Sequence, residues 1–280
     1  MADVCDVTVR QLRRRITEFV TRSNPAVQSV VETLKDLRLR GWTAFIFGGI
    51  PRGLLGEGWR YRPRDLDLVF DDDHFVCFES EFASSILRRN NYGGLRLQIR
   101  GAAVDAWPLS ATWAFREGLV KNASFERLPA TAFLNFDSIV VEAVPVRGTG
   151  RRVFEDGFFD GWSQKPLDIN LEENPHPAIC AARTLRISRR YGLKLSYRLC
   201  TYVWKVLSGA RLDEVERAER SHYGRAVFGT EGLRDARERL EKHLSSSSLP
   251  FPLFPGAPEQ VELRFDTDTG TRREETSWRG

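Results

Sequence analysis

The run Asp65-Leu66-Asp67-Leu68-Val69-Phe70 is the feature that most constrains what this chain can fold into. Acidic and apolar residues alternate at its start, and side chains two residues apart in a β-strand project from the same face. The pattern therefore predicts a strand over 65–70 with both aspartates on one face. Two carboxylates this close repel each other unless they share a cation or a proton. In isolation, an acidic face on a surface strand is the simpler explanation of the pair.

A second feature precedes the acidic strand. Residues 43–47 form a short apolar run that ends at Gly48-Gly49, which predicts a buried strand followed by a tight turn. A Gly-Gly turn lets backbone N–H groups approach a phosphate closely. Arg52 follows within one helical turn, and its planar guanidinium is suited to binding a phosphate. The segment is therefore a candidate phosphate-binding turn.

A third carboxylate lies further along the chain. Asp105 falls within a strand predicted at 102–107. If this strand neighbours the strand at 65–70, three carboxylates share one site. Magnesium prefers carboxylate and phosphate oxygens, and two such ions can activate a hydroxyl and stabilise a leaving pyrophosphate. The order of turn, Asp-x-Asp strand and later acidic strand is much more specific than any one of these features alone.

Hydrophobic periodicity and breaking residues predict the remaining elements and divide the chain. Helices are expected over 6–22, from a cap at Asn24-Pro25 to Gly41, and over 50–56, 74–90, 177–191, 196–208, 211–221 and 231–244. Further strands are expected over 95–100 and 136–146. The fold class is therefore α/β (α+β), with N-terminal helices at 1–41, a mixed-sheet domain at 42–160, a helical domain at 161–244, and a Ser/Pro-rich linker and mobile tail at 245–280.

Composition limits the broad class of protein. The chain has 280 residues, of which 41% are hydrophobic and 29% charged, so a folded, soluble protein is expected. No apolar run approaches the roughly 18 residues of a membrane span, and no apolar segment follows the first charges, so a cytoplasmic location is expected. The four cysteines are far apart in the sequence, which favours reduced thiols over a zinc site or disulfides.

Charge is distributed unevenly. The net charge is only +4, but residues 174–212 contain eight Lys or Arg and no Asp or Glu. Such a basic segment would attract a phosphate backbone. A solvated helix face explains the charge equally well, so charge alone does not decide between the two.

Three segments together resemble a known family. They are GGIPRGLLG at 48–56, DLDL at 65–68 and RTLRISRRYGL at 183–193. They are similar to motifs of the nucleotidyltransferase superfamily typified by DNA polymerase beta, and most closely to the head and neck of bacterial class II CCA-adding enzymes and poly(A) polymerases. The resemblance covers roughly residues 40–205.

This resemblance implies a mixed-sheet head that holds two Mg²⁺ ions, followed by a small helical neck. It implies an enzyme that transfers a nucleoside monophosphate from an NTP to an acceptor hydroxyl, with an RNA 3′ end such as that of tRNA as the expected acceptor and pyrophosphate as the product. The implied roles are metal binding and catalysis for Asp65, Asp67 and Asp105, triphosphate binding for Gly48, Gly49 and Arg52, and contact with the nucleotide or RNA end for Arg183 and Arg186.

The chain also departs from the family pattern. Pro51 and Gly53 replace the Val and Asp of the first motif, and 131–139 lacks the expected Arg-Arg-Asp. The base-choosing Glu-Asp-x-x-Arg is replaced by residues that include His176 and Cys180. These changes favour a divergent transferase acting on tRNA, another RNA or a protein hydroxyl, with a toxin or defence role compatible with them. The alternatives are a degenerate nucleotide- or RNA-binding module and a subunit regulated by a protein partner or by dimerisation.

Overall fold

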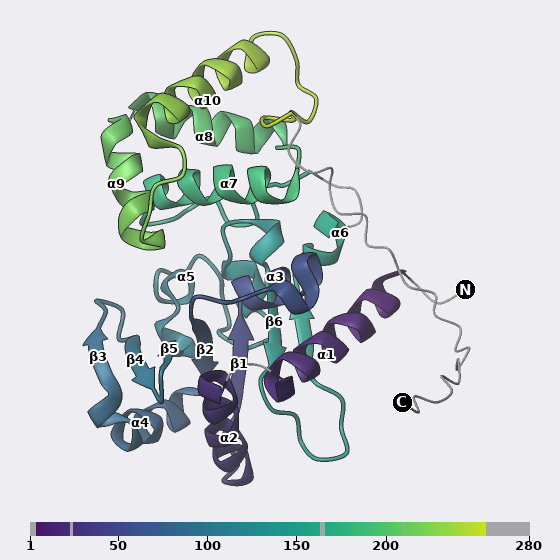
Figure 1. The fold of residues 1–280 in the computed structure, drawn as a ribbon, viewed down its shortest axis with the longest axis vertical. Helices are drawn as coiled ribbons and strands as arrows, with labels where there is room; N and C mark the ends of the chain where they lie inside the picture. Colours follow the sequence, from purple (N-terminus) through teal and green to yellow (C-terminus); the bar gives the residue numbers. More distant parts are fainter. Residues whose placement is uncertain (1–3, 23–24, 163–165, 210, 256–280) are drawn as a thin grey trace, which may run out of the picture.

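The computed structural model describes residues 4–22, 25–162, 166–209 and 211–255. In this part of the chain, a seven-stranded mixed sheet is followed by a group of helices (Figure 1). The strands are β1 (Ala44–Phe47), β2 (Leu66–Phe70), β3 (Ile86–Arg89), β4 (Leu95–Ile99), β5 (Ala102–Pro108), β6 (Ile139–Glu142) and β7 (Val153–Glu155). Their order is β3-β4-β5-β2-β1-β6-β7; the central pair β2 and β5 is parallel and the other pairs are antiparallel.

The helices divide between the sheet and the group that follows it. Those associated with the sheet are α1 (Val4–Arg22), α2 (Pro25–Leu39), α3 (Gly49–Glu57), α4 (Asp72–Glu81), α5 (Trp113–Arg116) and α6 (Phe158–Trp162). The following group consists of α7 (Pro177–Tyr191), α8 (Tyr197–Gly209), α9 (Leu212–Tyr223) and α10 (Gly229–Leu244). The architecture therefore confirms the predicted mixed α/β domain followed by a helical domain.

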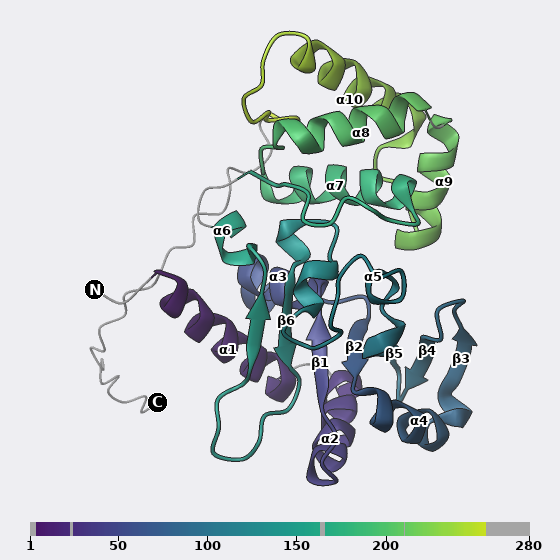
Figure 2. The ribbon, with the colours of Figure 1, turned by 180° about the vertical axis from the view of Figure 1, so that it is seen from behind.

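The two faces of the sheet are covered differently. Leu68 and Val104 belong to the large core that also contains apolar residues of α1, α2 and α3, and α1 and α2 lie in front of the sheet in Figure 1. Val69 and Val140 face the other way, into a smaller cluster with Leu128, and Figure 2 views the sheet from that side. Because neighbouring strand residues alternate between faces, Asp65, Asp67 and Asp105 share the second face.

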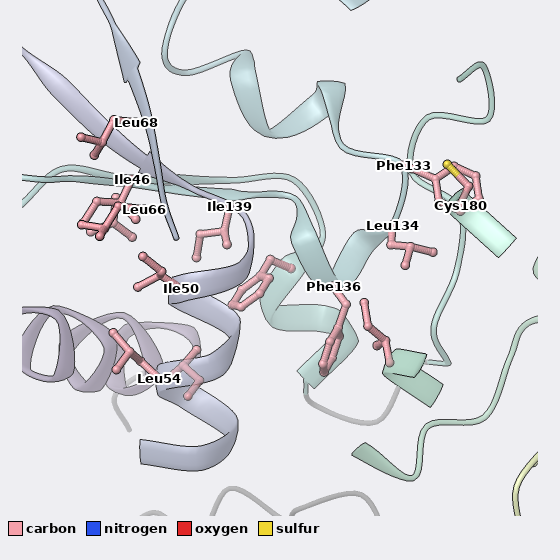
Figure 3. Close-up of a cluster of buried hydrophobic side chains, with 14 of the residues drawn as sticks. Ile46, Ile50, Leu54, Leu66, Leu68, Phe133, Leu134, Phe136, Ile139 and Cys180 are labelled. Atoms are coloured by element: carbon pink, nitrogen blue, oxygen red, sulfur yellow. The ribbon is translucent and has the colours of Figure 1, made fainter. Parts of the chain in front are cut away.

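A continuous core joins the sheet to the helical domain. Phe133, Leu134 and Phe136 lie in the segment that leads into β6, and Cys180 lies on α7 (Figure 3). All four belong to one buried cluster that also contains Ile50 of α3. Burial of apolar surface is the dominant favourable contribution to packing. The cluster therefore fixes α7 against the sheet and with it the side chains that α7 presents.

One predicted helix is wrong in its second half. The helix expected over 74–90 ends at Glu81, and residues 86–89 form the edge strand β3 instead. Ile86 pairs with Leu97 of β4, while Arg88 and Arg89 are exposed. Backbone pairing with β4 therefore overrides a helical pattern that has little apolar surface to bury after Phe82.

A predicted strand is also shorter than expected. The strand expected over 136–146 is limited to β6, because Asn135–Asp137 form a 3₁₀ turn. The cap expected at Asn24 and residues 256–280 of the linker and tail expected at 245–280 lie outside the described residues. Residues 245–255 are described: Phe251 exchanges backbone hydrogen bonds with Leu195, and Leu253 is fully buried.

Two further features concern the apolar character of the helices and the cysteine thiols. Among the described residues, no helix combines the length and the apolar composition that crossing a bilayer requires. Cys77, Cys180 and Cys200 are free thiols. The side chain of Cys5 lies outside the described part of the molecule.

Candidate active site

Three aspartates come together on the second face of the sheet. Asp67 of β2 and Asp105 of β5 are register partners in the parallel pair. Asp65 precedes β2 and lies two residues before Asp67, so it projects from the same face. The structure thus places the three sequence-predicted carboxylates at the junction of two central strands.

Burial and mutual repulsion make this cluster electrostatically unfavourable. Burial raises the pKa of Asp67 to about 7, and the charges of Asp65 and Asp105 add to the rise. The pKa of Asp105 is also raised, chiefly by burial. Among the residues that the structure describes, none forms a hydrogen bond or ion pair with the Asp67 side chain. Asp67 is thus a half-buried carboxylate without an ion-pair partner among the described residues, and a cation beside it would stabilise its charged form.

The structure adds a residue that the sequence reasoning missed. Arg96 of β4 is the register partner of Asp105. Its Nη1 lies 2.8 Å from Asp65 Oδ2 and also donates a hydrogen bond to Asp105 Oδ2. A guanidinium therefore bridges two of the three carboxylates. The signal was present in the sequence, because Leu95, Arg96 and Leu97 alternate as strand residues do.

The predicted phosphate-binding turn lies between β1 and α3. Gly48 has φ +68°, in the left-handed region that favours glycine, and it immediately precedes the first turn of α3. The first backbone N–H groups of a helix have no partner within the helix and carry partial positive charge. The turn of Gly48 and Gly49 therefore leads into a helix end that suits an anion, and its role in phosphate binding stays a prediction.

Arg52 and Arg183 are brought together by a residue that the sequence reasoning did not single out. Both form ion pairs with Asp137, which is in the 3₁₀ turn before β6, and the Arg183 Nε to Asp137 Oδ2 distance is 2.8 Å. Only 7% of the Asp137 side chain is exposed, against 15% for Arg52 and 32% for Arg183. The charge of Arg183 also opposes the rise in the pKa of Asp67, so the arginine pair and the acidic cluster form one electrostatic unit.

Arg186 has a different environment from Arg183. Its Nη1 is 2.9 Å from Oε1 of Glu219, a buried residue of α9. Its guanidinium also lies over the ring of Tyr223, 4.2 Å from the ring centroid. Of the two predicted α7 arginines, Arg183 thus contacts the sheet domain and Arg186 is engaged within the helical domain.

The end of α9 contacts the acidic strand directly. Arg64 pairs with Asp65 at 2.9 Å and donates a hydrogen bond to the backbone carbonyl of His222. Burial lowers the pKa of His222 to about 4, and the charges of nearby arginines, Arg183 first, add to the effect. The helical domain is therefore coupled to the segment that leads into β2 by polar contacts as well as by the core.

The glycine at position 53 has a physical explanation. The Tyr61 ring packs against the backbone of Gly53, in the space that a Cβ would occupy. Tyr61 is substantially buried, and burial raises the pKa of its hydroxyl. A larger residue at position 53 would therefore require the ring to move. Gly53, which stands where the family motif has Asp, thus leaves space for the Tyr61 ring.

The donor set is suited to a divalent cation, although it is not arranged as an enclosed metal centre. Carboxylate oxygens are the ligands that magnesium and manganese prefer, and Asp67 is unpaired. Within the described ranges, no three His, Cys, Asp or Glu side chains lie as a group that could hold a metal ion. Arg96 pairs with one oxygen each of Asp65 and Asp105, which accounts in part for the absence of such a group among these residues.

No family model matches the chain, and no curated protein matches it. The likeness to known proteins is therefore carried by the fold.

Solved structures with the same fold are CCA-adding and tRNA-processing enzymes. The Thermotoga maritima CCA-adding enzyme complexed with tRNA has a TM-score of 0.57 and 12% identity, with 83% of this chain and 54% of that chain covered. A CCA-adding enzyme in complex with CTP gives the same TM-score, 0.57, at 12% identity, covering 83% and 55%. A tRNA nucleotidyltransferase with a primer tRNA and an incoming ATP analogue has a TM-score of 0.51 at 15% identity, covering 76% and 60%.

The comparison defines the class of fold. The sheet domain and helices α7–α10 match the head and neck of a CCA-adding enzyme, as the sequence resemblance implied. This chain spans between 54% and 60% of the length of the three structures. At 12–15% identity the likeness shows the fold. Chemistry must therefore be argued from this chain's own residues.

Proposed function

We propose that this protein is a divalent-metal-dependent nucleotidyltransferase that transfers a nucleoside monophosphate from an NTP to the 3′ hydroxyl of an RNA, with tRNA as the favoured acceptor. One observation carries the proposal: Asp65, Asp67 and Asp105 share a face beside the α3 N-terminus. Carboxylates suited to cations therefore lie next to a turn suited to phosphates. The fold that this chain shares with enzymes solved with CTP, an ATP analogue or tRNA supports the same conclusion.

The proposed reaction is an in-line displacement at phosphorus. The acceptor oxygen forms a bond to the α-phosphorus while the bond from that phosphorus to the bridging oxygen of the pyrophosphate breaks. Pyrophosphate leaves with the electron pair, and the hydroxyl proton passes to a carboxylate or to water. Divalent cations, when bound, supply charge neutralisation for the attacking and leaving oxygens.

The residues of this chain position the reactants. Asp65 and Asp67 provide the cation ligands, and Asp105 lies on the side of β5, where it is placed to orient the acceptor hydroxyl. The backbone of Gly48 and Gly49 holds the triphosphate at the α3 N-terminus. These groups contribute by fixing geometry and by matching developing charge.

Arg52 and Arg183 are the proposed cationic partners of the triphosphate. In the structure both are paired with Asp137. A bound triphosphate presents more negative charge than a single carboxylate, so it competes for the guanidinium donors that Asp137 now holds. Asp137 keeps the two arginines in place near the site before nucleotide arrives.

Incorporation of label tests the proposal. The protein is incubated with Mg²⁺, each α-labelled NTP in turn and a total RNA pool, beside an Asp65→Ala/Asp67→Ala variant. Labelled RNA that disappears in the variant supports the proposal and identifies the nucleotide. A second double variant, Asp235→Ala/Glu238→Ala on α10, removes the same charge away from the site and should incorporate label normally. Label attached to protein instead of RNA would change the proposed acceptor to a protein hydroxyl.

Binding without turnover is the second candidate. This candidate is favoured by the ion pairs of Arg52 and Arg183 with Asp137, because they occupy the guanidinium groups that a transferase would use to bind the triphosphate. Under this alternative the basic segment 174–212 binds RNA in a salt-dependent way, and no NTP is incorporated. A role as a toxin or defence factor, and association with a protein partner or a second copy, remain predictions of the sequence. Co-purification and measurement of the mass in solution test these associations.

A further inference from the structure

The Tyr61 side chain runs along one face of α3 and ends at the glycine turn. Gly49 and Gly53 are one helical turn apart in α3, so they lie on the same face of the helix. The ring carbons of Tyr61 occupy the place where Gly53 would carry a Cβ. Tyr61 Oη lies 3.7 Å from the corresponding point at Gly49. The hydroxyl is therefore held beside the first residue of α3, and the missing side chain of Gly53 allows the ring to lie there.

Arg52 approaches the same side of Gly49. Its Nη2 lies 3.6 Å from the point where a Cβ of Gly49 would be, while its Nη1 donates a hydrogen bond to Asp137. Apart from the backbone of α3 and the chain neighbours of Gly49, no other heavy atom of the described residues lies within 4 Å of that point. The space beside Gly49 is thus bordered by a hydroxyl and a guanidinium and is otherwise open.

Both side chains have donors without partners in the described part of the chain. Arg52 Nε is buried and forms no hydrogen bond. The hydroxyl of Tyr61 forms none with the described residues either. Burial raises the pKa of this hydroxyl, so it keeps its proton at neutral pH and can donate a hydrogen bond. Because donors away from water are usually satisfied, unpaired donors beside one open space indicate that an acceptor binds there.

The hydroxyl of Tyr61 is also within electrostatic reach of the acidic cluster. The charge of Asp67 adds to the rise in the pKa of Tyr61, and the charge of Arg52 opposes it. Tyr61 shortly precedes Asp65 in the chain, so one short segment carries both residues. An anion beside Gly49 would therefore lie close to the carboxylates that the proposed reaction requires.

We propose that Tyr61 is a substrate-binding residue, whose hydroxyl and Arg52 Nη2 together hold one phosphate group of the NTP in the space beside Gly49. This inference rests on the proposed function, which identifies the anion as a triphosphate. A phosphate has several acceptor oxygens, so it can accept from the hydroxyl, the guanidinium and the first backbone N–H groups of α3 at once. The hydrogen bond from Arg52 Nη1 to Asp137 then orients the guanidinium for this contact.

Titration calorimetry with inorganic tripolyphosphate tests the inference without measuring activity. This probe has the phosphates of an NTP but no base or sugar, and chelator is present so that no divalent cation contributes. If binding requires Mg²⁺, the same comparison is made with Mg²⁺ in place of chelator. Tyr61→Phe keeps the ring and removes only the hydroxyl. We expect its affinity to fall about tenfold or more, because a hydrogen bond to a charged group is lost.

Two further variants show where the probe binds. Tyr191→Phe is the matched control, because it removes the hydroxyl of a nearby buried tyrosine that donates to Glu57 Oε1 at 2.9 Å, and it should leave the affinity unchanged. Gly49→Ala places a methyl group in the open space at ordinary contact distances, so it should fold and bind tripolyphosphate more weakly. In the Gly49→Ala background, Tyr61→Phe should have little further effect, because both changes act on the same contact.

The outcomes separate this inference from the proposed function. Equal affinity in the native chain and Tyr61→Phe, or equal losses in Tyr61→Phe and Tyr191→Phe, would overturn the inference and leave the proposed function standing. If Tyr61→Phe does not fold, unchanged affinity in Gly49→Ala would overturn the inference. No tripolyphosphate bound by the folded native chain, with or without Mg²⁺, would overturn the triphosphate site of the proposed function and the inference with it.

Discussion

Asp67 and Asp105 are register partners across β2 and β5, the parallel pair at the centre of the sheet. They come from strands that are separated by more than thirty residues of chain. Hydrogen bonding between two central strands fixes their backbones, so the cluster is held rigidly although it is electrostatically unfavourable. An electrostatically unfavourable cluster held in this way is the basis of our proposal that a cation binds here.

The metal-free protein should become more stable when Asp67 is replaced by Asn. Burial raises the pKa of Asp67 to about 7, so above that pH the folded state holds a charge at a free-energy cost. We expect Asp67→Asn to raise the free energy of unfolding by about 1 kcal/mol or more at pH 8 with chelator present. Urea denaturation checks this. A less stable variant would contradict the electrostatic description of the cluster.

Replacing Asp137 by Asn should destabilise the protein. The change leaves Arg52 and Arg183 without the buried carboxylate that they share. Removing one partner of a largely buried pair leaves uncompensated charge, so we expect a loss of about 2–3 kcal/mol in the free energy of unfolding. The matched control is Glu172→Gln, which breaks the exposed pair with Arg198 and should cost about 0–1 kcal/mol. Equal losses in the two variants would contradict this prediction.

The effect of Gly53→Ala on the free energy of unfolding should reverse its sign when Tyr61 is replaced. In the native chain the added methyl meets the Tyr61 ring, and overpacking of about 1–3 kcal/mol outweighs the gain of about 1 kcal/mol in helix propensity. In a Tyr61→Ala background the ring is absent, so the same change should stabilise α3. Free energies of unfolding for the four proteins of this cycle provide the measurement. Identical effects in both backgrounds would show that the Tyr61 ring is not the reason why a larger residue is unfavourable at position 53.

Stability should fall in mild acid because of His222. The pKa of its imidazole is lowered to about 4 in the folded state, below its ordinary value of 6.5. The unfolded chain therefore binds more protons between these two values, and stability is lost as pH falls from about 6.5 to 4. At pH 5 the loss attributable to this group is about 1–2 kcal/mol relative to pH 7.5.

The His222→Gln variant isolates that contribution. Its stability should depend less on pH over the same interval than that of the native chain. Urea denaturation at pH 5 and pH 7.5 for both proteins gives the comparison. Parallel pH dependence in the two proteins would exclude His222 as the source.

The acidic strand and the glycine turn were predictable because their signals are local. Alternation in 65–70 determines which residues share a face, and an apolar run before Gly48-Gly49 indicates a strand and a turn. The partner of Asp105 was predictable in principle. Arg100 and Gly101 both have positive φ in the two-residue turn between β4 and β5, and such a turn sets the register that places Arg96 opposite Asp105.

Other parts of the site depend on long-range packing. Asp137 was hidden within a predicted strand, and only the 3₁₀ turn at 135–137 brings it to Arg52 and Arg183. The strand at 86–89 is determined by pairing with β4, which a helical pattern in the sequence does not reveal. Contacts of this kind join residues far apart in the chain, so one sequence without tertiary information does not specify them.

The balance between pyrophosphate released and nucleotide incorporated tests the central claim most directly. The native chain, Mg²⁺, the NTP selected by labelling and the RNA acceptor are combined, and both products are quantified over time. The account predicts one pyrophosphate for each nucleotide added, with the rate in Asp67→Asn reduced by about a thousandfold or more. Release of pyrophosphate without incorporation, or an unchanged rate in Asp67→Asn, would contradict nucleotidyl transfer at this site.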